Sequence, residues 1–176
     1  MKTRLVTKVD LRDRFREQIE DFTVLKEIVA DARAARGLLG WIKQRTAADD
    51  GSIWLLDVAE ECLEVVVGRD DFVGFRQPTA RGLVSMVVWS EHAIAISDVA
   101  QHERFDDTAD RALRYQTKTI VVQPLVVRGR LIGVVSAVNK QGAASFDGDD
   151  QQTMALGASL LGTAIESTLL ARLVSY

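Results

Sequence analysis

Few side chains in this sequence could do covalent or metal chemistry, and they are widely spaced. There is one cysteine, Cys62, and there are two histidines, His92 and His102. A single thiol cannot form an internal disulfide, and a cysteine-based redox cycle needs a second thiol to resolve the oxidised sulfur. The two histidines are ten residues apart and neither has a second histidine or a cysteine close to it in the sequence, so we predict no metal site.

Acidic residues gather in one polar stretch, where Asp106, Asp107 and Asp110 could form an acid site or a cation-binding loop. No histidine or glutamate is spaced to accompany them, and the chain has neither a phosphate-binding glycine loop nor a G-x-S-x-G motif. A solvated loop with a helix cap explains these aspartates more simply. We therefore expect that the protein is not an enzyme.

Composition places the chain among ordinary globular proteins and excludes several partners. Its 176 residues are 47% hydrophobic and 27% charged, enough for one domain with a sizeable core. The net charge is -3 with the basic residues scattered, so direct nucleic-acid binding is not expected. The apolar runs Ile120–Val122 and Leu131–Val135 are strand-sized, which predicts no membrane segment. A single cysteine favours a reducing cytoplasm.

The N-terminal part of the sequence is predicted to be helical. Six apolar residues recur at spacings of three and four, which predicts one narrow helical stripe that Asp10 caps: Leu11, Phe15, Ile19, Phe22, Leu25 and Val29. The residues around Leu38–Ile42 predict a second short helix that ends near Asp49–Gly51.

Strands and loops follow in the middle of the chain. Branched apolar runs predict strands at Ser52–Val58, Leu63–Val67, Phe72–Gln77 and Ala93–Ser97. A four-residue apolar spacing predicts a helix over Gly82–Ser90. The polar, aspartate-rich segment 98–113 predicts a loop with a short helix near residues 107–114.

A β-hairpin is the strongest local signal. The runs Thr119–Val127 and Arg130–Val138 flank a two-residue turn with glycine in its second position. Pro124 cannot donate to a strand ladder, so we expect a bulge beside it. Asp147 is placed to cap a last helix, whose predicted buried face is Met154, Leu161, Ile165, Leu169 and Leu173.

Several short motifs along this order of elements resemble those of the GAF domain family. They are Gly82-Leu83-Val84, Ile96-Ser97-Asp98-Val99, His102-Glu103-Arg104-Phe105, Gln123-Pro124-Leu125 with Gly129 and Ile132-Gly133-Val134, and Asn139-Lys140 with Phe146 and Asp150. The last set is similar to the N-K…F…D-E signature of the cyclic-nucleotide-binding branch, with Gln151 in place of the final glutamate.

The resemblance implies an α+β fold of the GAF type. It consists of a six-stranded antiparallel sheet in the order 3-2-1-6-5-4, with the N- and C-terminal helices on one face and the pocket helices and loops on the other. The implied domain spans residues 22–170. Residues 1–21 would form an N-terminal helix for dimerisation or connection, and residues 171–176 the end of the C-terminal helix.

The resemblance also implies a ligand pocket. Carried over position by position, its lining is Ser52, Val67, Gly68, Leu83, Val84, Asp110, Leu113, Thr117 and Ser136. Amides at the start of the pocket helix could receive a phosphate. Relatives that bind cyclic nucleotides have an aromatic residue and an acid where this chain has Val67-Gly68, which counts against a cyclic nucleotide. The alternative is that these residues line a filled core.

The remaining motif residues predict architecture. Asn139 can bond the backbone at a strand end, and Lys140 can pair with Asp150 on the following helix, beside Phe146. Haem at His102 and bilin at Cys62 are not expected, because a lone loop histidine is usually solvated and Cys62 fits a core position. The sequence thus assigns no cofactor.

Three classes of function remain open at this stage. The first is a sensory domain that binds a small molecule and signals as a homodimer through its terminal helices, either free-standing or as part of a longer signalling protein with an output domain. The second is a dimerisation or protein-interaction module without a ligand. The third is an enzyme whose catalytic groups the sequence does not reveal. The composition and the resemblance favour the first.

Overall fold

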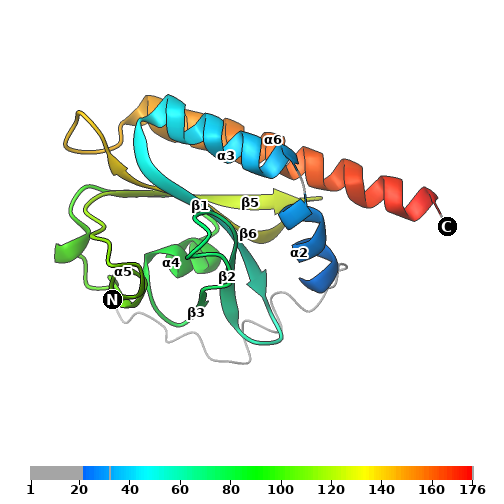
Figure 1. Cartoon of the computed structure of the whole chain (residues 1–176), viewed down its shortest axis with the longest axis horizontal. Helices are drawn as coiled ribbons and strands as arrows, with labels where there is room; N and C mark the ends of the chain where they lie inside the picture. Colours follow the sequence, from blue (N-terminus) through cyan, green and yellow to red (C-terminus); the bar gives the residue numbers. More distant parts are fainter. Residues whose placement is uncertain (1–21, 32, 176) are drawn as a thin grey trace.

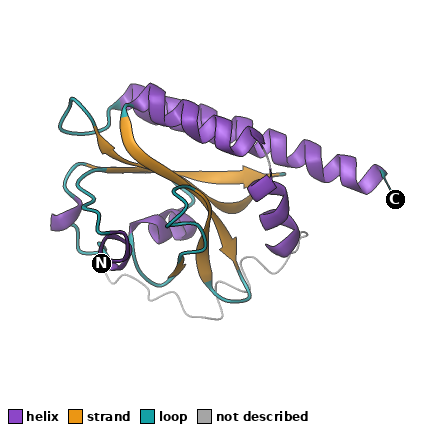
Figure 2. Cartoon of the chain, viewed as in Figure 1, coloured by secondary structure: helices purple, strands orange, loops and turns teal. Residues whose placement is uncertain are grey.

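The computed structural model describes residues 22–31 and 33–175. Their centre is one antiparallel sheet in the order β3-β2-β1-β6-β5-β4, which confirms the predicted fold (Figures 1 and 2). The strands are β1 (Ala48–Asp57), β2 (Cys62–Val67), β3 (Arg76–Pro78), β4 (Ile94–Ile96), β5 (Ile120–Val127) and β6 (Arg130–Lys140). The predicted helix over residues 1–21 lies outside the described residues.

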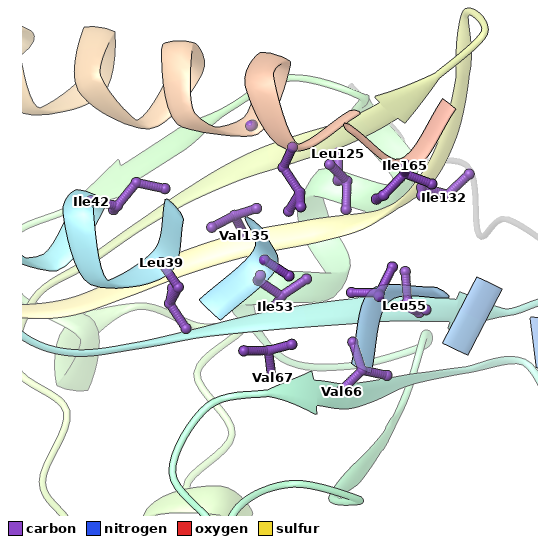
Figure 3. Packing of buried hydrophobic residues seen from close by; sticks show 14 of the residues in the cluster. Leu39, Ile42, Ile53, Leu55, Val66, Val67, Leu125, Ile132, Val135 and Ile165 are labelled. Carbon is purple, nitrogen blue, oxygen red and sulfur yellow. The ribbon is translucent and has the colours of Figure 1, made fainter. Parts of the chain in front are cut away.

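Three helices cover one face of the sheet: α2 (Phe22–Asp31), α3 (Arg33–Thr46) and α6 (Gly148–Val174) (Figure 1). Leu39 and Ile42 from α3, Val135 from β6 and Ile165 from α6 belong to the larger of two apolar cores (Figure 3). The two long helices approach closely, since a Cβ atom on Gly157 would lie 2.5 Å from the Ile42 side chain.

A buried ionic cluster ties α2 to the sheet edge. The Glu64 side chain on β2 is almost fully buried and bonds to both Lys26 of α2 and Arg76 of β3. The Arg76 guanidinium lies 2.7 Å from one Glu64 oxygen. Burial alone would raise the pKa of Glu64, but the hydrogen bonds from Lys26 and Arg76 outweigh it and lower that pKa.

Helix α6 begins as predicted at Asp147. The Asp150 amide donates to the Asp147 carboxylate at 2.9 Å, and the Asp150 carboxylate accepts from the Asp147 amide at 2.9 Å, which completes a capping box. Four of the five residues predicted for its buried face are buried; Leu173 is not, with 67% of its surface exposed. The last turns of α6 extend past the sheet, so Leu173 has no strand beneath it (Figure 1).

By length and composition alone, α6 is apolar enough to cross a membrane. It is the one such helix in the part of the chain that the structure describes. Core packing also explains why α6 is apolar, because one side of this helix packs on β5 and α3 as part of the larger core.

The opposite face of the sheet carries shorter elements, namely α4 (Leu83–Ser90), a 3-10 turn (Val99–Gln101) and α5 (Thr108–Leu113). Helix α4 packs on β5 and β6 and supplies Val87 and Val88 to the smaller core. No residue of α5 is buried, so this helix is held by the loop around it and not by a core of its own.

Two predicted boundaries were wrong. Helix α3 ends at Thr46, and residues 49–51 belong to β1, because Asp50 and Gly51 already pair with β6. Strand β3 is confined to residues 76–78, since residues 69–75 form turns in which the Phe72 amide donates to the Arg69 carbonyl at 2.9 Å.

The hairpin is confirmed. Arg128 and Gly129 both have positive φ, of 51° and 73°, as a two-residue turn with the strand twist requires. The ladder irregularity expected beside Pro124 lies between Leu125 and Val126, while Pro124 itself stays opposite Val134.

Candidate functional site

A cavity of about 80 Å³ lies between the sheet and the elements that cover its second face. Its walls come from β1, β6, the start of α4, and the segment from Phe105 to Ile120 that includes α5. The lining residues are Asp50, Gly51, Ser52, Trp54, Phe72, Gln77, Leu83, Val84, Phe105, Asp106, Ala109, Asp110, Leu113, Tyr115, Thr117, Ile120, Ser136 and Val138.

Seven of the nine predicted pocket residues line this cavity. Ser52 and Ser136 come from the central strands, and Leu83 and Val84 from the first turn of α4. The other three come from the segment that covers the cavity: Asp110, Leu113 and Thr117. The structure thus brings together residues from positions 52 to 136 of the chain around one space.

Val67 and Gly68 do not line the cavity. Strict alternation along β2 would place Leu63, Val65 and Val67 on one face of the sheet. The register shifts between Ile53 and Trp54, so that Val66 is an extra residue and Val67 turns into the core beneath the helices. Gly68 follows it, and both line a separate groove on the helix side.

Aromatic rings that the sequence analysis did not identify occupy the cavity wall. Trp54 meets Phe72 edge to face, with ring centroids 5.3 Å apart and planes at 88°. Phe105 and Tyr115 line the cavity from the covering segment. Trp54 stands two residues after Ser52 on the same strand, and this period-two spacing was the signal that could have revealed it.

The cavity floor is a small hydrogen-bonded polar group. The hydroxyl oxygens of Ser52 and Ser136 lie 3.0 Å apart, and the Trp54 indole donates to the Ser136 hydroxyl at 3.1 Å. All three side chains are buried. Their bonds fix the Trp54 ring at the base of the cavity.

Asp110 and Thr117 bond to each other across the covering segment. The Asp110 carboxylate accepts from the Thr117 amide at 2.7 Å and from its hydroxyl at 2.6 Å. These bonds close the chain between α5 and β5. A ligand that contacts either side chain must therefore share or replace this interaction.

Tyr115 fastens the same segment to the sheet. Its hydroxyl donates to the Asp49 carboxylate at 2.6 Å and accepts from the Asn139 amide nitrogen at 3.0 Å. Burial, and then the bond to Asp49, raise the pKa of Tyr115, so the phenol stays protonated. The Asn139 side chain also accepts from the Lys118 amide at 2.7 Å, so Asn139 helps to hold the covering segment against the sheet.

On the other side of the cavity, Gln77 and Asp106 connect β3, α4 and the covering segment. The Gln77 amide donates to the Arg81 carbonyl at 3.0 Å and lies against Gly82, where a Cβ atom would clash with it. Asp106 pairs with Arg81 at 3.2 Å. Hydrogen bonds from Thr108 lower the pKa of Asp106 and keep it ionised.

The motif residues Lys140, Phe146 and Asp150 lie outside the cavity. The Lys140 ammonium lies 2.8 Å from the Asp150 carboxylate, and both side chains are largely buried. Phe146 is buried in the core under α6. This geometry joins the end of β6 to the start of α6.

The thiol and the imidazoles also lie outside the cavity. Cys62 is buried, and burial raises the pKa of its thiol, which makes it a poor nucleophile. The His102 ring accepts from the Arg104 amide at 3.1 Å. Within residues 22–31 and 33–175, no three histidine, cysteine, aspartate or glutamate side chains are grouped to hold a metal ion.

Comparison with known proteins agrees with this architecture. The model of the GAF domain matches residues 24–165. A GAF domain of a Coxiella burnetii phosphoenolpyruvate-protein phosphotransferase superposes with a TM-score of 0.70 at 16% identity, over 94% of this chain and 98% of that one. A free methionine-R-sulfoxide reductase of Neisseria meningitidis superposes with a TM-score of 0.67 at 21% identity, over 84% and 87%.

Curated relatives include cyclic phosphodiesterases. A probable 3',5'-cyclic phosphodiesterase of Caenorhabditis elegans is 24% identical over 81% of this chain and 21% of its own length. The rod cGMP-specific 3',5'-cyclic phosphodiesterase subunit alpha of Bos taurus is 24% identical over 82% and 17%. The chain thus spans about a fifth of the length of these relatives. It belongs to the GAF domain family, whose members are generally regulatory.

Proposed function

We propose that this protein is a non-catalytic sensory domain that binds a small molecule in the cavity between the sheet and the Phe105–Ile120 segment. The observation that carries the proposal is the cavity itself, which has an aromatic and polar wall and a cover held by separate hydrogen bonds. Such a cover can open for a ligand without unfolding the sheet beneath it.

The charges around the cavity favour a neutral or cationic ligand. Asp50, Asp106 and Asp110 are in its wall, and no lysine, arginine or histidine of the described chain lines it. Carboxylates accept hydrogen bonds and repel anions. A flat ring with donor groups would use Trp54 and Phe105 for stacking and the aspartates for hydrogen bonding. A cyclic nucleotide would bring its phosphate close to these carboxylates, which disfavours it.

The ligand must be small, or the cover must move. The volume of about 80 Å³ is well below the roughly 300–1,000 Å³ of pockets that enclose drug-sized molecules. A nucleobase-sized ring would displace part of the Asp110–Thr117 contact, whereas a larger molecule would also have to release Tyr115.

A thermal-shift screen tests this proposal, since a ligand that binds only the folded state raises the melting temperature. The panel contains nucleobases, aromatic and basic amino acids, cyclic mononucleotides, other nucleotides and 2-oxo acids. We expect a saturating rise with neutral or cationic rings that a substitution blocking the cavity abolishes, and no such cavity-dependent rise with the anions. A cavity-dependent rise confined to cyclic nucleotides would contradict the charge argument.

Two variants of α5 locate the binding site. Ala109→Phe places a ring into the cavity from a partly exposed helix, so it should abolish the shift without unfolding the protein. Ala112→Phe adds the same ring on the exposed side of the same helix and should leave the shift intact. Equal behaviour of the two variants would place the ligand elsewhere.

We further propose that the protein signals as a homodimer through α6. The outer side of this helix has exposed residues at spacings of four and three: Leu156, Leu160, Thr163, Ser167, Leu170 and Val174. We call them the outer seam. At 100° per residue they lie opposite the buried face of α6. Leu156, Leu160 and Leu170 are each about half exposed, which is costly for a monomer.

The predicted buried face of α6 cannot supply this interface. Ile165 and Leu169 are 1% and 6% exposed and pack within their own chain, so neither is available to a partner. Light scattering of Leu160→Lys, with Thr168→Lys as an exposed control away from the outer seam, tests the dimer. A monomeric Leu160→Lys and a dimeric Thr168→Lys are expected, while an unchanged mass in Leu160→Lys would exclude this interface.

The second candidate function is an interaction module without a ligand. It predicts a dimer through the outer seam and no thermal shift with any compound of the panel. Under either function, the domain that receives the signal would belong to a longer signalling protein. The phosphodiesterase relatives, of whose length this chain spans about a fifth, support that proposal.

A further inference from the structure

We infer that the helix side of this protein carries a second binding site, which takes a small molecule with one or two phosphate groups. The site is a groove of about 270 Å³ between α3 and the ends of β1 and β2. It is separate from the ligand cavity and does not depend on the function proposed for that cavity.

The groove exists because no helix covers this corner of the sheet. Helix α2 packs over the other end of β2, and α3 lies over β1. The bulge at Val66 turns Val67 toward this side, and Gly51 adds no side chain to fill the space: a Cβ atom there would lie 3.1 Å from the Leu39 side chain and 3.4 Å from that of Lys43. A volume of about 270 Å³ is roughly nine times the ~30 Å³ that a water molecule occupies in the liquid, so a phosphoryl group with several waters fits.

Three cations surround the groove. Arg36 and Lys43 are seven residues apart on one side of α3, and Arg69 follows β2 across the groove. Asp50 is the one acidic residue among the described residues that line it. The positive charge therefore exceeds the negative charge, in contrast to the acidic wall of the cavity on the other face.

These cations are only partly neutralised within the chain. Asp50 lies 3.4 Å from Lys43 and 3.9 Å from Arg69, and both distances are too long for strong hydrogen bonds. Arg69 makes its close contacts with Asp71, outside the groove. Arg36 makes no ion pair with any of the described residues and is exposed. Arginine and lysine in this arrangement are suited to phosphate oxygens.

The floor of the groove consists of glycines. Gly40, Gly51 and Gly68 all line it. A Cβ atom on Gly40 would meet no atom within 4 Å, so packing does not require glycine there, although glycine in a helix interior costs about 1 kcal/mol relative to alanine. Glycine at this position leaves the space between Arg36 and Lys43 open to a ligand.

The groove shares a wall with the cavity. Asp50 and Gly51 line both spaces, and the Gly51 amide donates to the Asp50 carboxylate at 2.7 Å. The Arg69 guanidinium lies 5.8 Å from the centre of the Tyr115 ring, which lines the cavity. An anion that draws Lys43 and Arg69 away from Asp50 would therefore change the cavity wall, and linkage makes this effect reciprocal.

Amide NMR of the whole protein, titrated with inorganic phosphate and with pyrophosphate at constant ionic strength, tests the site. We expect saturating shifts at Gly40, Gly51 and Gly68, with tighter binding of pyrophosphate. Arg36→Gln or Lys43→Gln should weaken binding at least about tenfold, as loss of a charged hydrogen bond implies.

The matched control is Arg45→Gln, which removes the same charge from the same helix on an exposed side away from the groove. It should bind phosphate like the unchanged protein. Arg36 is exposed and Lys43 is partly exposed, so melting temperatures will show that their variants remain folded. Shifts that do not saturate, or that decline equally in Arg45→Gln, would reveal only non-specific ionic attraction and overturn the site.

Discussion

The contact between β1 and β6 at Gly133 allows a sharp test of the sheet register. Gly133 lies opposite Leu55, and a Cβ atom built on it would lie 1.9 Å from the Trp54 carbonyl oxygen and 2.9 Å from its carbon. Both atoms belong to the backbone of a central strand. They cannot rotate away as a side chain could, so Gly133→Ala must push the two strands apart.

The expected cost combines two opposing effects. Replacing glycine by alanine in a strand gains about 0.5–1 kcal/mol from the unfolded state. Overpacking typically costs about 1–3 kcal/mol and more where the backbone must move, as it must here. We expect a net loss of at least about 2 kcal/mol in the free energy of unfolding, which lowers the melting temperature of a domain of this size by about 4–8 °C.

Urea unfolding of Gly133→Ala and of Gly37→Ala, monitored by circular dichroism, measures this loss against a control of opposite sign. A Cβ atom on Gly37 would meet nothing within 4 Å, and this residue lies in the helical part of α3, so Gly37→Ala should gain up to about 1 kcal/mol. A Gly133→Ala variant as stable as the unchanged protein would refute the close approach of β1 and β6.

Three further predictions concern charge and packing. Lys140→Met leaves the buried Asp150 without its ion pair and should lower the free energy of unfolding, measured in urea, by about 2–4 kcal/mol. A loss below about 0.5 kcal/mol is typical of exposed ion pairs and would contradict a buried pair. Because the pKa of Glu64 is lowered on folding, its stabilisation is present above about pH 4.5 and lost as the pH falls through the folded pKa. The free energy of unfolding of Glu64→Gln should therefore be about 1–2 kcal/mol below that of the unchanged protein at pH 7, and closer to it at pH 3. A difference that does not change with pH would contradict the lowered pKa of Glu64. Leu169→Lys buries a charge and should unfold the domain, while Leu170→Lys should only weaken the proposed dimer. Thermal melts and light scattering distinguish the two variants, and equal melting temperatures would contradict the burial of Leu169.

Elements that depend on a few neighbouring residues could be predicted from the sequence. The hairpin turn at Arg128-Gly129 and the cap at Asp147 depend on a few neighbouring residues, so both could be predicted. The motifs then supplied the order of strands, which no local rule contains. Seven of the nine pocket residues that the resemblance implied line the cavity, and two of them, Ser52 and Ser136, come from strands that the topology makes adjacent.

What failed depended on contacts distant in sequence. The bulge at Val66 arises from how β2 pairs with Ile53 and Trp54, and it reverses the side to which Val67 points. Phe72 was assigned to a strand because its neighbours are apolar, but it sits in a turn and packs on Trp54. The exposure of Leu173 follows from the length of the sheet beneath α6, which helical periodicity does not contain.

The last turns of α6, which continue past the sheet, determine how this domain could be joined to another (Figure 1). Because the outer seam follows a seven-residue repeat, a helix fused after Val174 inherits its rotational phase. One residue inserted at the junction rotates everything downstream by about 100°, and seven residues nearly restore it. Under the proposed signalling through α6, a series of fusions differing by single residues should therefore alternate between active and inactive output about once per helical turn of about 3.6 residues, with a close return at seven.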